Sequence, residues 1–558
     1  MTRESQSGRH ILVAVAWPYA NGPLHLGHIA GAYLPADIFA RYHRMAGNRV
    51  LMVSGSDQHG TPVTVRADNE GVGPKEIADR YHPTFLELWE KLGISFDIFT
   101  STGTPNHTAV VHDVFARLME NGYIYRKTTQ QFFDPQAGRF LPDRYVEGTC
   151  PHCGYENARG DQCDNCGRTL DPDQLIAPRS KLTGATPEMR DTEHFFFKLS
   201  AFQEPLLDWL RSRTGWRKHV QNFSIGFVEE GLHDRAITRD IDWGVSVPVE
   251  DLGAGKRIYV WIEALIGYLS ASKEWALREG DAEAWRPWWE DADSGTYYFI
   301  GKDNIPFHTI IWPAILMGYG GLNLPTDVPA NQYVTFKGEK ASKSQAIGDS
   351  ALSYLERYQP DAIRYALAAN LPETSDTDMT EAEIIRRNND ELVATWGNLV
   401  NRVLAMTQRS FAGRVPQPGV LDHRDEQIVE HGRTLVHQVG QLIEAVHLKA
   451  ALSAAMAFAQ EANGYLSETE PWKTAKSDPE RTATSLYVAL CAITALDVAL
   501  YPFLPVSSQM VHAYLGLEGA VEDAGWAARR PEPGTQLGAA EPLFRKIDTP
   551  EGEARLSA

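Results

Sequence analysis

The sequence predicts an α/β protein: a Rossmann-like parallel sheet domain, interrupted by an inserted cysteine-bearing knuckle and followed by an α-helical bundle. Short apolar runs alternate with helix-like stretches near the start of the chain and again near residue 300. Residues 122–234, between these regions, are rich in turns and carry four clustered cysteines. After about residue 380 the apolar residues recur at helical spacing. These three observations together predict the fold class.

The parallel sheet is predicted from strands that are apolar on both faces. Residues 11–16 (Ile-Leu-Val-Ala-Val-Ala) and 50–53 (Val-Leu-Met-Val) are such runs, and residues 28–45 between them have helical spacing. A strand, a helix and a second strand in close succession form a βαβ unit, whose two strands are parallel. A second such region begins at 297–300 and continues into the apolar residues 307–317.

Helical spacing predicts an all-helical C-terminal region. Thr380 and Glu383 have the spacing of a capping box, which begins a helix. The residues that then recur on one helical face are Leu392, Trp396, Leu399, Val400 and Val403. Further helices are expected over 448–466 and 485–500, where Cys491 is expected to be a buried apolar residue. The last forty residues, rich in Gly, Pro and Ala, are expected to return over the body as a tail.

Composition is that of an ordinary globular protein, with 43% hydrophobic and 22% charged residues in a chain of 558. The net charge of −19 argues against nucleic acid as a partner, although a local basic patch can coexist with it. No apolar run reaches the roughly 20 residues that span a bilayer. The polar start and the short apolar run that follows it do not resemble a secretory signal, so a cytoplasmic protein is expected.

Four cysteines form two CxxCG turns, Cys150-Pro-His-Cys153-Gly and Cys163-Asp-Asn-Cys166-Gly. Each turn can direct two thiolates at one ion, and four thiolates suit tetrahedral zinc in a closed structural site. Two disulfides are the competing interpretation, disfavoured in a cytoplasmic setting, and a redox dithiol is a third. The sequence therefore predicts a zinc knuckle that has no open position for catalysis.

Two short motifs indicate nucleotide chemistry. The first strand is followed by His25-Leu-Gly-His28 at a helix start, where unpaired N–H groups and the helix dipole suit phosphate. Gly27 removes a side chain where adenine or ribose would approach. Far downstream, Lys340-Ala-Ser-Lys343-Ser follows a predicted strand over 333–336 in a Gly-flanked loop. Lysines in such a loop can neutralise charge on a departing pyrophosphate.

This pair resembles the HIGH and KMSKS signatures of class I aminoacyl-tRNA synthetases, and further segments resemble the methionyl branch of that family. These segments are Ala16-Trp-Pro-Tyr-Ala-Asn-Gly22, Asp57-Gln-His-Gly-Thr61, Phe140-Leu-Pro-Asp-Arg144, Glu193-His-Phe-Phe196, Tyr259-Val-Trp261, Gly267-Tyr268, Gly301-Lys-Asp303 and Trp396-Gly-Asn398. They follow the family's order from about residue 10 to residue 475.

The resemblance implies a methionine–tRNA ligase, whose partners are ATP, L-methionine and tRNA(Met). ATP binding, with Mg²⁺, is implied for His25, Gly27, His28, Gly301, Asp303, Lys340 and Lys343, and catalysis for His25, His28, Lys340 and Lys343. Methionine binding is implied for Trp17, Tyr19, Asp57, Trp261, Ala264, Tyr268 and His308, with Asp57 on the ammonium and the rings around the thioether. Anticodon contacts are implied for Asn398 and Trp472, which lies next to Pro471 beyond the segment Asn463-Gly-Tyr465.

The resemblance also implies the domain organisation. The expected domains are the first half of the catalytic domain (1–121), a connective insertion (122–235) with the zinc knuckle at 150–166, the second half (236–325), a signature-loop and stem-contact region (326–380), a helical anticodon-binding domain (381–517) and a tail (518–558). The insertion is too short for the editing domain of the valine, leucine and isoleucine enzymes. No appended tRNA-binding module follows the helices, so a monomer is expected.

Several positions depart from the family's usual pattern. Trp17 stands where many relatives have leucine, and Glu263 and Leu265 where Asp and Pro or Val are common. Ala341 replaces the signature methionine, and Ala394 an anticodon-facing asparagine. Three alternatives stay open: a synthetase for another amino acid, a specialised or inhibitor-insensitive methionyl paralogue, and a catalytically silent tRNA- or zinc-binding descendant, against which His25, His28, Lys343 and Asp57 argue.

Overall fold

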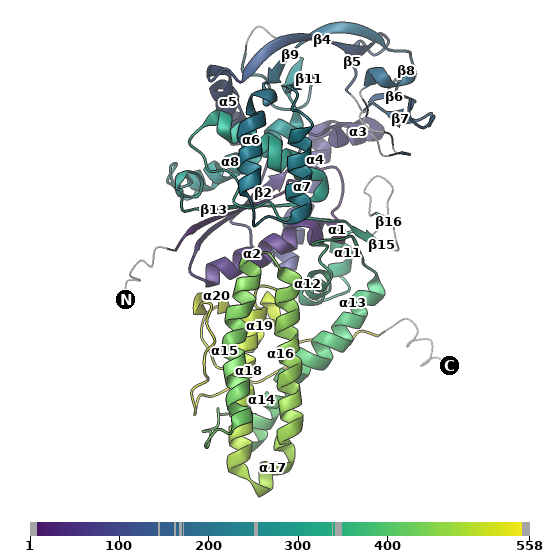
Figure 1. Ribbon diagram of the computed structural model, residues 1–558. Coiled ribbons are helices and arrows are strands. Elements are labelled where there is room, and N and C mark those ends of the chain that lie inside the picture. The colour runs from purple at the N-terminus through teal and green to yellow at the C-terminus, as the bar shows by residue number, and fades with distance from the viewer. Residues whose placement is uncertain are drawn as a thin grey trace, which may run out of the picture.

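The computed structural model describes residues 8–548 except 143–144, 161–162, 164, 167–169, 171, 250–254, 337–338 and 341–348, and it gives no side-chain environment for 336, 339 and 340. The protein is elongated (Figure 1). The sheet domain lies in the middle, the inserted strands at one end and the helical bundle at the other, with α17 (Pro471–Ser477) at the tip of the bundle.

The sheet domain is built on a five-stranded parallel sheet in the order β14-β13-β1-β2-β3. These strands are β14 (Ala330–Asn331), β13 (Gly295–Gly301), β1 (His10–Val15), β2 (Arg49–Ser56) and β3 (Ile98–Ser101). The predicted strands at 11–16, 50–53 and 297–300 are confirmed. Alternate residues of β1 enter two different cores: Ile11, Val13 and Val15 face one, Leu12 and Ala14 the other. Both faces of the sheet are therefore covered, as its doubly apolar strands require.

The helix predicted over 28–45 forms as one continuous helical segment of three parts. They are α1 (Leu26–His28), the π-helical η1 (Ile29–Tyr33) and α2 (Leu34–Met45). The opposite face of the sheet is covered by α5 (Pro105–Glu120), α8 (Val260–Arg278) and α10 (Trp312–Tyr319), whose apolar residues join the second core. Helix α4 (Pro74–Leu92) joins the first core, and α3 (Thr61–Glu70) packs against α4.

The described residues between α5 and α8 contain three small antiparallel sheets, the smallest of which is the pair of β11 (Thr238–Asp240) and β12 (Lys256–Ile258). The first has the order β10-β9-β4-β5, with β4 (Ile124–Asp134) and β9 (Glu188–Phe197) paired along their length and β5 (Arg139–Phe140) and β10 (Arg235–Ala236) at the edges. The second carries the cysteines and consists of β6 (Val146–Thr149), β7 (Ala158–Arg159) and β8 (Ile176–Ser180). Two helices complete the insertion, α6 (Gln203–Ser212) and α7 (Lys218–Glu229).

The C-terminal region is helical, as predicted. Thr380 Oγ1 accepts a hydrogen bond from the Glu383 amide and so caps α13 (Glu381–Arg387). The elements that follow are η8 (Asn388–Gly397), α14 (Asn398–Phe411), α15 (His423–Glu444), α16 (Leu448–Thr469), α17, α18 (Pro479–Leu500), α19 (Pro505–Tyr514) and α20 (Val521–Ala524). The tail returns over the body: the Trp526 amide bonds to Met45 O at 2.9 Å, and Asn388 Nδ2 to Arg545 O at 2.9 Å.

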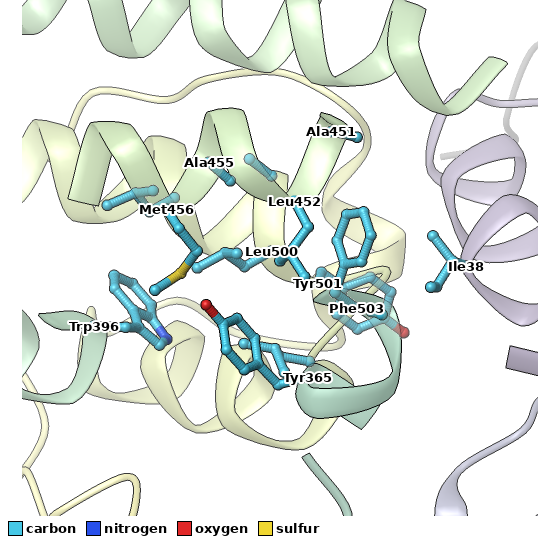
Figure 2. Packing of buried hydrophobic residues seen from close by; sticks show 14 of the residues in the cluster. Ile38, Tyr365, Trp396, Ala451, Leu452, Ala455, Met456, Leu500, Tyr501 and Phe503 are labelled. Atoms are coloured by element: carbon cyan, nitrogen blue, oxygen red, sulfur yellow. The ribbon is translucent and has the colours of Figure 1, made fainter. Parts of the chain in front are cut away.

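Helix α18 forms the centre of the bundle. By length and composition it is the one helix in the described part of the chain that could cross a bilayer, but its apolar window is wholly buried inside the protein. Cys491, on this helix, is 6% exposed, so its predicted burial is confirmed. Leu500 and Phe503 at its end pack with Tyr365, Met456 and Trp396 (Figure 2). α18 is therefore a core helix.

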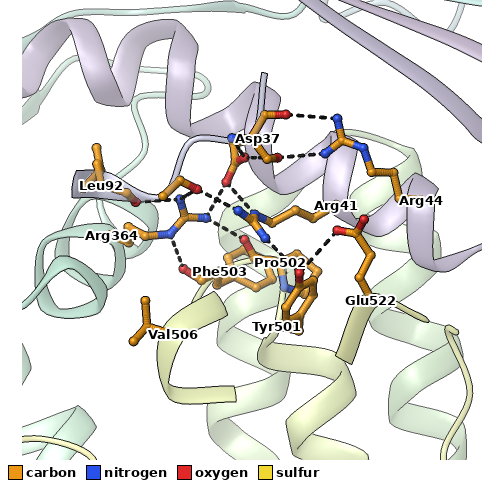
Figure 3. A network of polar contacts seen from close by, with 12 residues as sticks. Asp37, Arg41, Arg44, Leu92, Arg364, Tyr501, Pro502, Phe503, Val506 and Glu522 are labelled. Carbon is orange, nitrogen blue, oxygen red and sulfur yellow. Dashed lines mark hydrogen bonds and ion pairs between the residues drawn. The ribbon is translucent and has the colours of Figure 1, made fainter. Parts of the chain in front are cut away.

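The sheet domain and the bundle share this core, and a buried charged network joins them (Figure 3). Asp37 on α2 accepts hydrogen bonds from Arg41 Nε at 2.9 Å and from Arg364 Nη2 at 2.7 Å. Arg364, on α12 (Pro360–Ala369), also donates to Pro502 O and Phe503 O, each at 2.9 Å. Both Asp37 and Arg364 have fully buried side chains. The network therefore fixes the end of α18 against the helix that follows the HLGH motif.

Candidate active site

The residues predicted to bind methionine come together at the carboxyl edge of the parallel sheet. Trp17 and Tyr19 follow β1, Asp57 follows β2, and His308 follows β13 in the π-helical η7 (Phe307–Ile311). Helix α8 supplies the other three. In open α/β sheets this edge is where ligands bind, because all the strand ends and the loops after them meet there.

All seven of these residues line one pocket of about 370 Å³. The complete lining is Ala16, Trp17, Tyr19, Asp57, Trp261, Ala264, Leu265, Tyr268, Asn304 and His308. Ala16 and Asn304 were not predicted from the sequence to line this pocket, and Leu265 was identified only as a departure from the family's pattern. Their position in the sequence could have indicated them, since each is adjacent to a residue that was predicted to bind methionine or ATP. The pocket is mostly aromatic and apolar with one carboxylate, which suits an amino acid that has an apolar side chain.

His308 and Tyr268 form a buried polar wall whose protonation follows from their contacts. Nδ1 of His308 lies 2.9 Å from Asn304 O, and Nε2 lies 2.7 Å from the Tyr268 hydroxyl. Burial lowers the pKa of His308 to about 4, so the ring is neutral at neutral pH. Because Asn304 O can only accept, Nδ1 carries the proton, and the Tyr268 hydroxyl therefore donates to Nε2.

Aromatic rings fix the shape of the pocket. Trp261 stacks on Phe307 with ring centroids 4.0 Å apart and planes 13° from parallel, and Tyr19 meets Trp261 edge-on at 6.2 Å. The Trp17 indole lies between two glycines. A methyl group on Gly267 would come within 2.9 Å of the indole, and one on Gly55 still closer. These glycines therefore permit tryptophan at this position.

Asp57 is the buried carboxylate of the pocket, 3% exposed. Its backbone is fixed by the bonds Asp57 N to Pro18 O and Ala20 N to Asp57 O, both 2.8 Å. Burial, followed by the charge of Glu263, raises the pKa of Asp57 to about 8. A cation placed beside it would restore the ionised form, so this carboxylate is suited to bind an ammonium group.

The two histidines of the HLGH motif lie against each other at the start of α1, with ring planes tilted by 45°. Their ring centroids are 3.8 Å apart, and the His25 amide donates to His28 Nδ1 at 3.3 Å. A methyl group on Gly27 would lie 3.0 Å from the His25 ring, so glycine keeps this turn narrow. Both rings are half-buried, which leaves them able to reach a ligand at the edge of the sheet.

The KASKS loop begins and ends beside the HLGH motif. It leaves from β15 (Val334–Phe336) and β16 (Glu339–Lys340), and the Val334 carbonyl lies 3.6 Å from a methyl placed on Gly27. On its far side Ser350 forms a β-bridge with His25. The backbone of Lys340 pairs with Thr335, whereas its side chain and all of Lys343 lie outside the described residues. Two motifs more than 300 residues apart are thus brought together.

Gly301 ends β13, and Asp303 lies in the 3₁₀ turn η6 (Lys302–Asn304) after it. The Asp303 carboxylate accepts a hydrogen bond from the Tyr333 hydroxyl, and Lys302 lies over the Tyr333 ring at 3.8 Å. Burial and the Asp303 contact raise the pKa of Tyr333. Asp303 is therefore held at the end of a central strand, where a ribose would be bound in this fold class.

The four sulfur atoms of the knuckle lie within 4.8 Å of one another. Two pairs, Cys150 with Cys166 and Cys153 with Cys163, are 3.9 and 3.6 Å apart, and all four cysteines are free. Disulfides require about 2.05 Å between sulfurs, whereas a tetrahedral zinc with bonds of about 2.3 Å places them roughly 3.8 Å apart. The donor set fits one Cys₄ metal ion and excludes the disulfide alternative.

The residues predicted to contact an anticodon lie on the bundle, away from the sheet. Trp472 is 44% exposed on α17, and the Arg402 guanidinium lies over its ring at 5.0 Å. Asn398 Nδ2 bonds to Asn463 Oδ1 at 3.4 Å, and Asn463 Nδ2 to Thr395 O at 3.0 Å. An exposed indole beside a cation is a platform on which a nucleobase can stack.

The return of both ends of the KASKS loop to the HLGH helix, on a parallel sheet, defines the catalytic domain of a class I aminoacyl-tRNA synthetase. Comparison with protein families gives the same class. The model described as "tRNA synthetases class I (M)" matches residues 11–404, and that of the "Anticodon binding domain of methionyl tRNA ligase" matches 415–556. The chain belongs to the methionyl-tRNA synthetase family.

Similar proteins align with this chain over nearly its whole length. The methionine–tRNA ligase of Roseiflexus sp. (strain RS-1) is 54% identical over 98% of this chain and 91% of its own length. That of Dehalococcoides mccartyi (strain BAV1) is 55% identical over 96% and 97%. The Mycobacterium tuberculosis methionyl-tRNA synthetase bound by methionyl-adenylate superposes with a TM-score of 0.80, at 27% identity, covering 97% of this chain and all of that one.

Proposed function

We propose that this chain activates L-methionine with ATP and transfers the methionyl group to the 3′-terminal adenosine of tRNA(Met). One observation supports this most strongly: seven residues from four separate segments, expected to bind methionine, line a single pocket at the carboxyl edge of the sheet. The HLGH motif begins six residues beyond Tyr19 on the same loop, so phosphate-binding and amino-acid-binding groups are neighbours.

In the first step a carboxylate oxygen of methionine attacks the α-phosphorus of ATP. An O–P bond forms, the bond from the α-phosphorus to the bridging oxygen breaks, and pyrophosphate leaves with the electron pair. The substrate supplies the nucleophile, so the protein needs only to position reactants and stabilise charge. His25 and His28 hold the phosphates, with Mg²⁺ accompanying ATP. Lys340 and Lys343 neutralise the departing pyrophosphate.

The remaining nucleotide and amino-acid contacts follow from position. Gly27 and Gly301 allow close approach of the nucleotide, and Asp303 accepts hydrogen bonds from the ribose hydroxyls. Asp57 pairs with the methionine ammonium. The rings of Trp17, Tyr19, Trp261, Tyr268 and His308, with Ala264, enclose the thioether, whose polarisable sulfur packs well against aromatic groups.

In the second step the 2′-hydroxyl of the terminal adenosine attacks the methionyl carbonyl. An ester bond forms, the bond from the carbonyl carbon to the phosphate oxygen breaks, AMP leaves with that electron pair, and the hydroxyl proton is lost to solvent. Residues 381–517 serve as the anticodon-binding domain. There Trp472 stacks on an anticodon base, and Asn398, at the start of α14, contacts the same loop. Support comes from the exposed indole at the tip of the bundle, remote from the sheet.

Three further properties belong to this proposal. Cys150, Cys153, Cys163 and Cys166 bind one structural Zn²⁺, supported by sulfur separations that fit a tetrahedral ion. The protein acts in the cytoplasm, supported by its membership of the methionyl-tRNA synthetase family. It is a monomer, supported by the scattering of its large exposed apolar side chains over separate elements.

The test is amino-acid-dependent ATP–pyrophosphate exchange measured with each of the twenty amino acids, followed by charging of tRNA(Met). Exchange with methionine alone is the expected result. Exchange with another amino acid instead of methionine would establish a different synthetase, and no exchange at all would establish a silent descendant. Methionine-dependent exchange that persists in the presence of inhibitors of other methionyl-tRNA synthetases would favour the specialised paralogue. That alternative is considered because Trp17 lines the pocket.

A further inference from the structure

Glu263 is a wholly buried carboxylate directly behind the wall of the methionine pocket, and the proposed reaction assigns it no role. It lies in the first turn of α8, next to Ala264, with a side chain that is 0% exposed. Both of its carboxylate oxygens lie 3.2 Å from Nδ1 of His59, and one lies 3.7 Å from Nε2 of His107. A buried carboxylate is costly unless its charge is balanced, so its partners have to be identified.

His107 is the more distant of the two histidines beside Glu263. Its Nδ1 lies 2.9 Å from Ser270 Oγ, and its Nε2 lies 3.7 Å from a Glu263 oxygen, against 3.2 Å for His59 Nδ1. Burial lowers the pKa of His107 and outweighs its contact with Glu263, which favours the neutral form of the ring. Among the described residues, His59 is therefore the closer partner of Glu263 and the one that balances its charge.

His59 is held in place and connects Glu263 to Asp57. Its ring meets Trp243 edge-on at 5.3 Å, and Trp243 Nε1 donates to Gln58 O at 2.7 Å. The His59 amide donates to Asp57 Oδ1 at 3.1 Å. Burial alone would lower the pKa of His59, but the charge and hydrogen bond of Glu263 outweigh it and raise that pKa, which favours the imidazolium. The chain of contacts thus runs from Glu263 through His59 to the pocket carboxylate.

We propose that Glu263 and His59 form a buried ion pair whose function is to position Asp57 for the methionine ammonium group. The pair anchors the backbone of His59, whose amide holds Asp57 Oδ1. This inference rests on the proposed role of Asp57. Glu263 and His59 are positioning residues, because neither of them lines the methionine pocket.

The pair also has a consequence for pH dependence. Asp57, with a pKa of about 8 when no substrate is bound, takes up a proton at lower pH, and the KM for methionine is expected to rise about tenfold per pH unit below that value. Among charged groups, Glu263 contributes most to raising the pKa of Asp57. Removing its charge should therefore lower that pKa, and the rise in the KM for methionine should begin at a lower pH. The other charged or titratable groups around the pair are His107 on α5, Glu274 on α8 and Arg257 on β12 (Lys256–Ile258).

The test is the pH profile of pyrophosphate exchange in Glu263→Gln, an isosteric change that removes the charge. At pH 9, where Asp57 is ionised in both proteins, the KM for methionine should rise on the order of tenfold, because Asp57 is less well held. The break in the profile should move to lower pH, while the KM for ATP stays within about twofold. Glu263→Asp should recover much of the loss. Glu274→Gln, on the same helix but bonded to Thr100, is the matched control and should behave as wild type.

Two further measurements separate positioning from folding. For a methionine analogue that lacks the α-amino group, inhibition constants of wild type and Glu263→Gln should be equal, since no ammonium is present. His59→Gln should resemble Glu263→Gln, and the double variant should be no worse than either single one. An unchanged methionine KM and pH profile, or equal losses for ATP, methionine and the analogue, would overturn the proposal. If Asp57→Asn also left the methionine KM unchanged, the proposed role of Asp57 itself would fail.

Discussion

At the scale of single residues, the shape of the pocket depends on the absence of side chains at Gly55 and Gly267. Trp17 fills the space that side chains at 55 and 267 would otherwise take, and Gly267 lies on a helix where alanine would normally be preferred. The departure at Trp17 and the glycine on α8 are therefore one structural feature. A residue that looks anomalous in the sequence has its explanation more than 200 positions away.

Gly267→Ala is expected to raise the KM for methionine about tenfold, because the new methyl group lies 2.9 Å from the indole and has to displace it. The measurement is methionine-dependent pyrophosphate exchange. Gly226→Ala on α7, where a methyl meets nothing within 4 Å, is the control and should change nothing. In a Trp17→Leu background the Gly267→Ala effect should shrink. An equal effect in both backgrounds would contradict the steric explanation.

At the scale of elements, the knuckle is a small unit with its own core. Cys150 and Cys163 are buried in a cluster with Phe132, Leu141, Tyr145, Val146, Ala158, Leu170 and Leu175, separate from the two large cores. It is attached to the sheet domain at Tyr145, whose hydroxyl donates to Asp68 on α3 at 2.7 Å. So few apolar residues give little stability of their own, and a metal ion bound by the four cysteines would supply more.

The expected zinc content is one ion per chain in the wild type and a strongly reduced content in Cys163→Ser, because a neutral hydroxyl is a poor replacement for a thiolate. Zinc is measured by metal analysis after dialysis. Methionine-dependent pyrophosphate exchange should be retained at least in part, since no cysteine lies in the methionine pocket. Cys491→Ser on α18 is the control and should keep its zinc. Stoichiometric zinc in Cys163→Ser would contradict the Cys₄ assignment.

The sequence predicted what is encoded locally. Three features could be predicted because each is a contiguous pattern in the sequence: the strands that are apolar on both faces, the CxxCG turns and the two signature motifs. The family resemblance predicted that the two signatures belong to one active site. The π-helical turn after the HLGH motif was not predicted, because five residues are too few to show a change of period within a longer helical pattern. The contact of Glu263 with His59 and that of Asp37 with Arg364 join residues 204 and 327 positions apart, and no local pattern reports them.

At the scale of the whole molecule, the network around Asp37 joins the catalytic and helical parts. Arg41 and Arg364 outweigh the effect of burial and hold the pKa of Asp37 well below its usual value of about 3.9. A lowered pKa contributes stability that is present above the unfolded value and is lost as the pH falls through the folded one. The network therefore keeps its full contribution at neutral pH and weakens only in acid.

Arg364→Met is expected to reduce the free energy of unfolding by about 3–5 kcal/mol, because it leaves a buried carboxylate with one fewer partner and several carbonyls unsatisfied. Thermal or denaturant unfolding measures it. The control is Arg433→Met, which removes an exposed ion pair with Glu430 and should leave the midpoint of the unfolding transition unchanged. Equal midpoints for the two variants would show that the network contributes nothing.

Trp472→Ala tests the separation between the two ends of the molecule. Pyrophosphate exchange should be unchanged, whereas the KM for tRNA should rise by roughly tenfold to a hundredfold, the effect of about 1–3 kcal/mol from a lost base stack. The control is Lys476→Ala on the same short helix, which tests for loss of charge alone. A parallel loss of exchange in Trp472→Ala would indicate a folding defect instead of a lost contact.

The shared core of the two domains has a consequence for synthesis on the ribosome. Ile38 on α2 joins the same core as Leu500, which lies 462 positions later in the chain (Figure 2). At about 5–20 residues per second, the ribosome needs roughly 25–90 seconds to supply that partner. Throughout this interval the nascent sheet domain presents an uncovered apolar surface, so newborn chains of this protein are natural clients for chaperones until the last helices emerge.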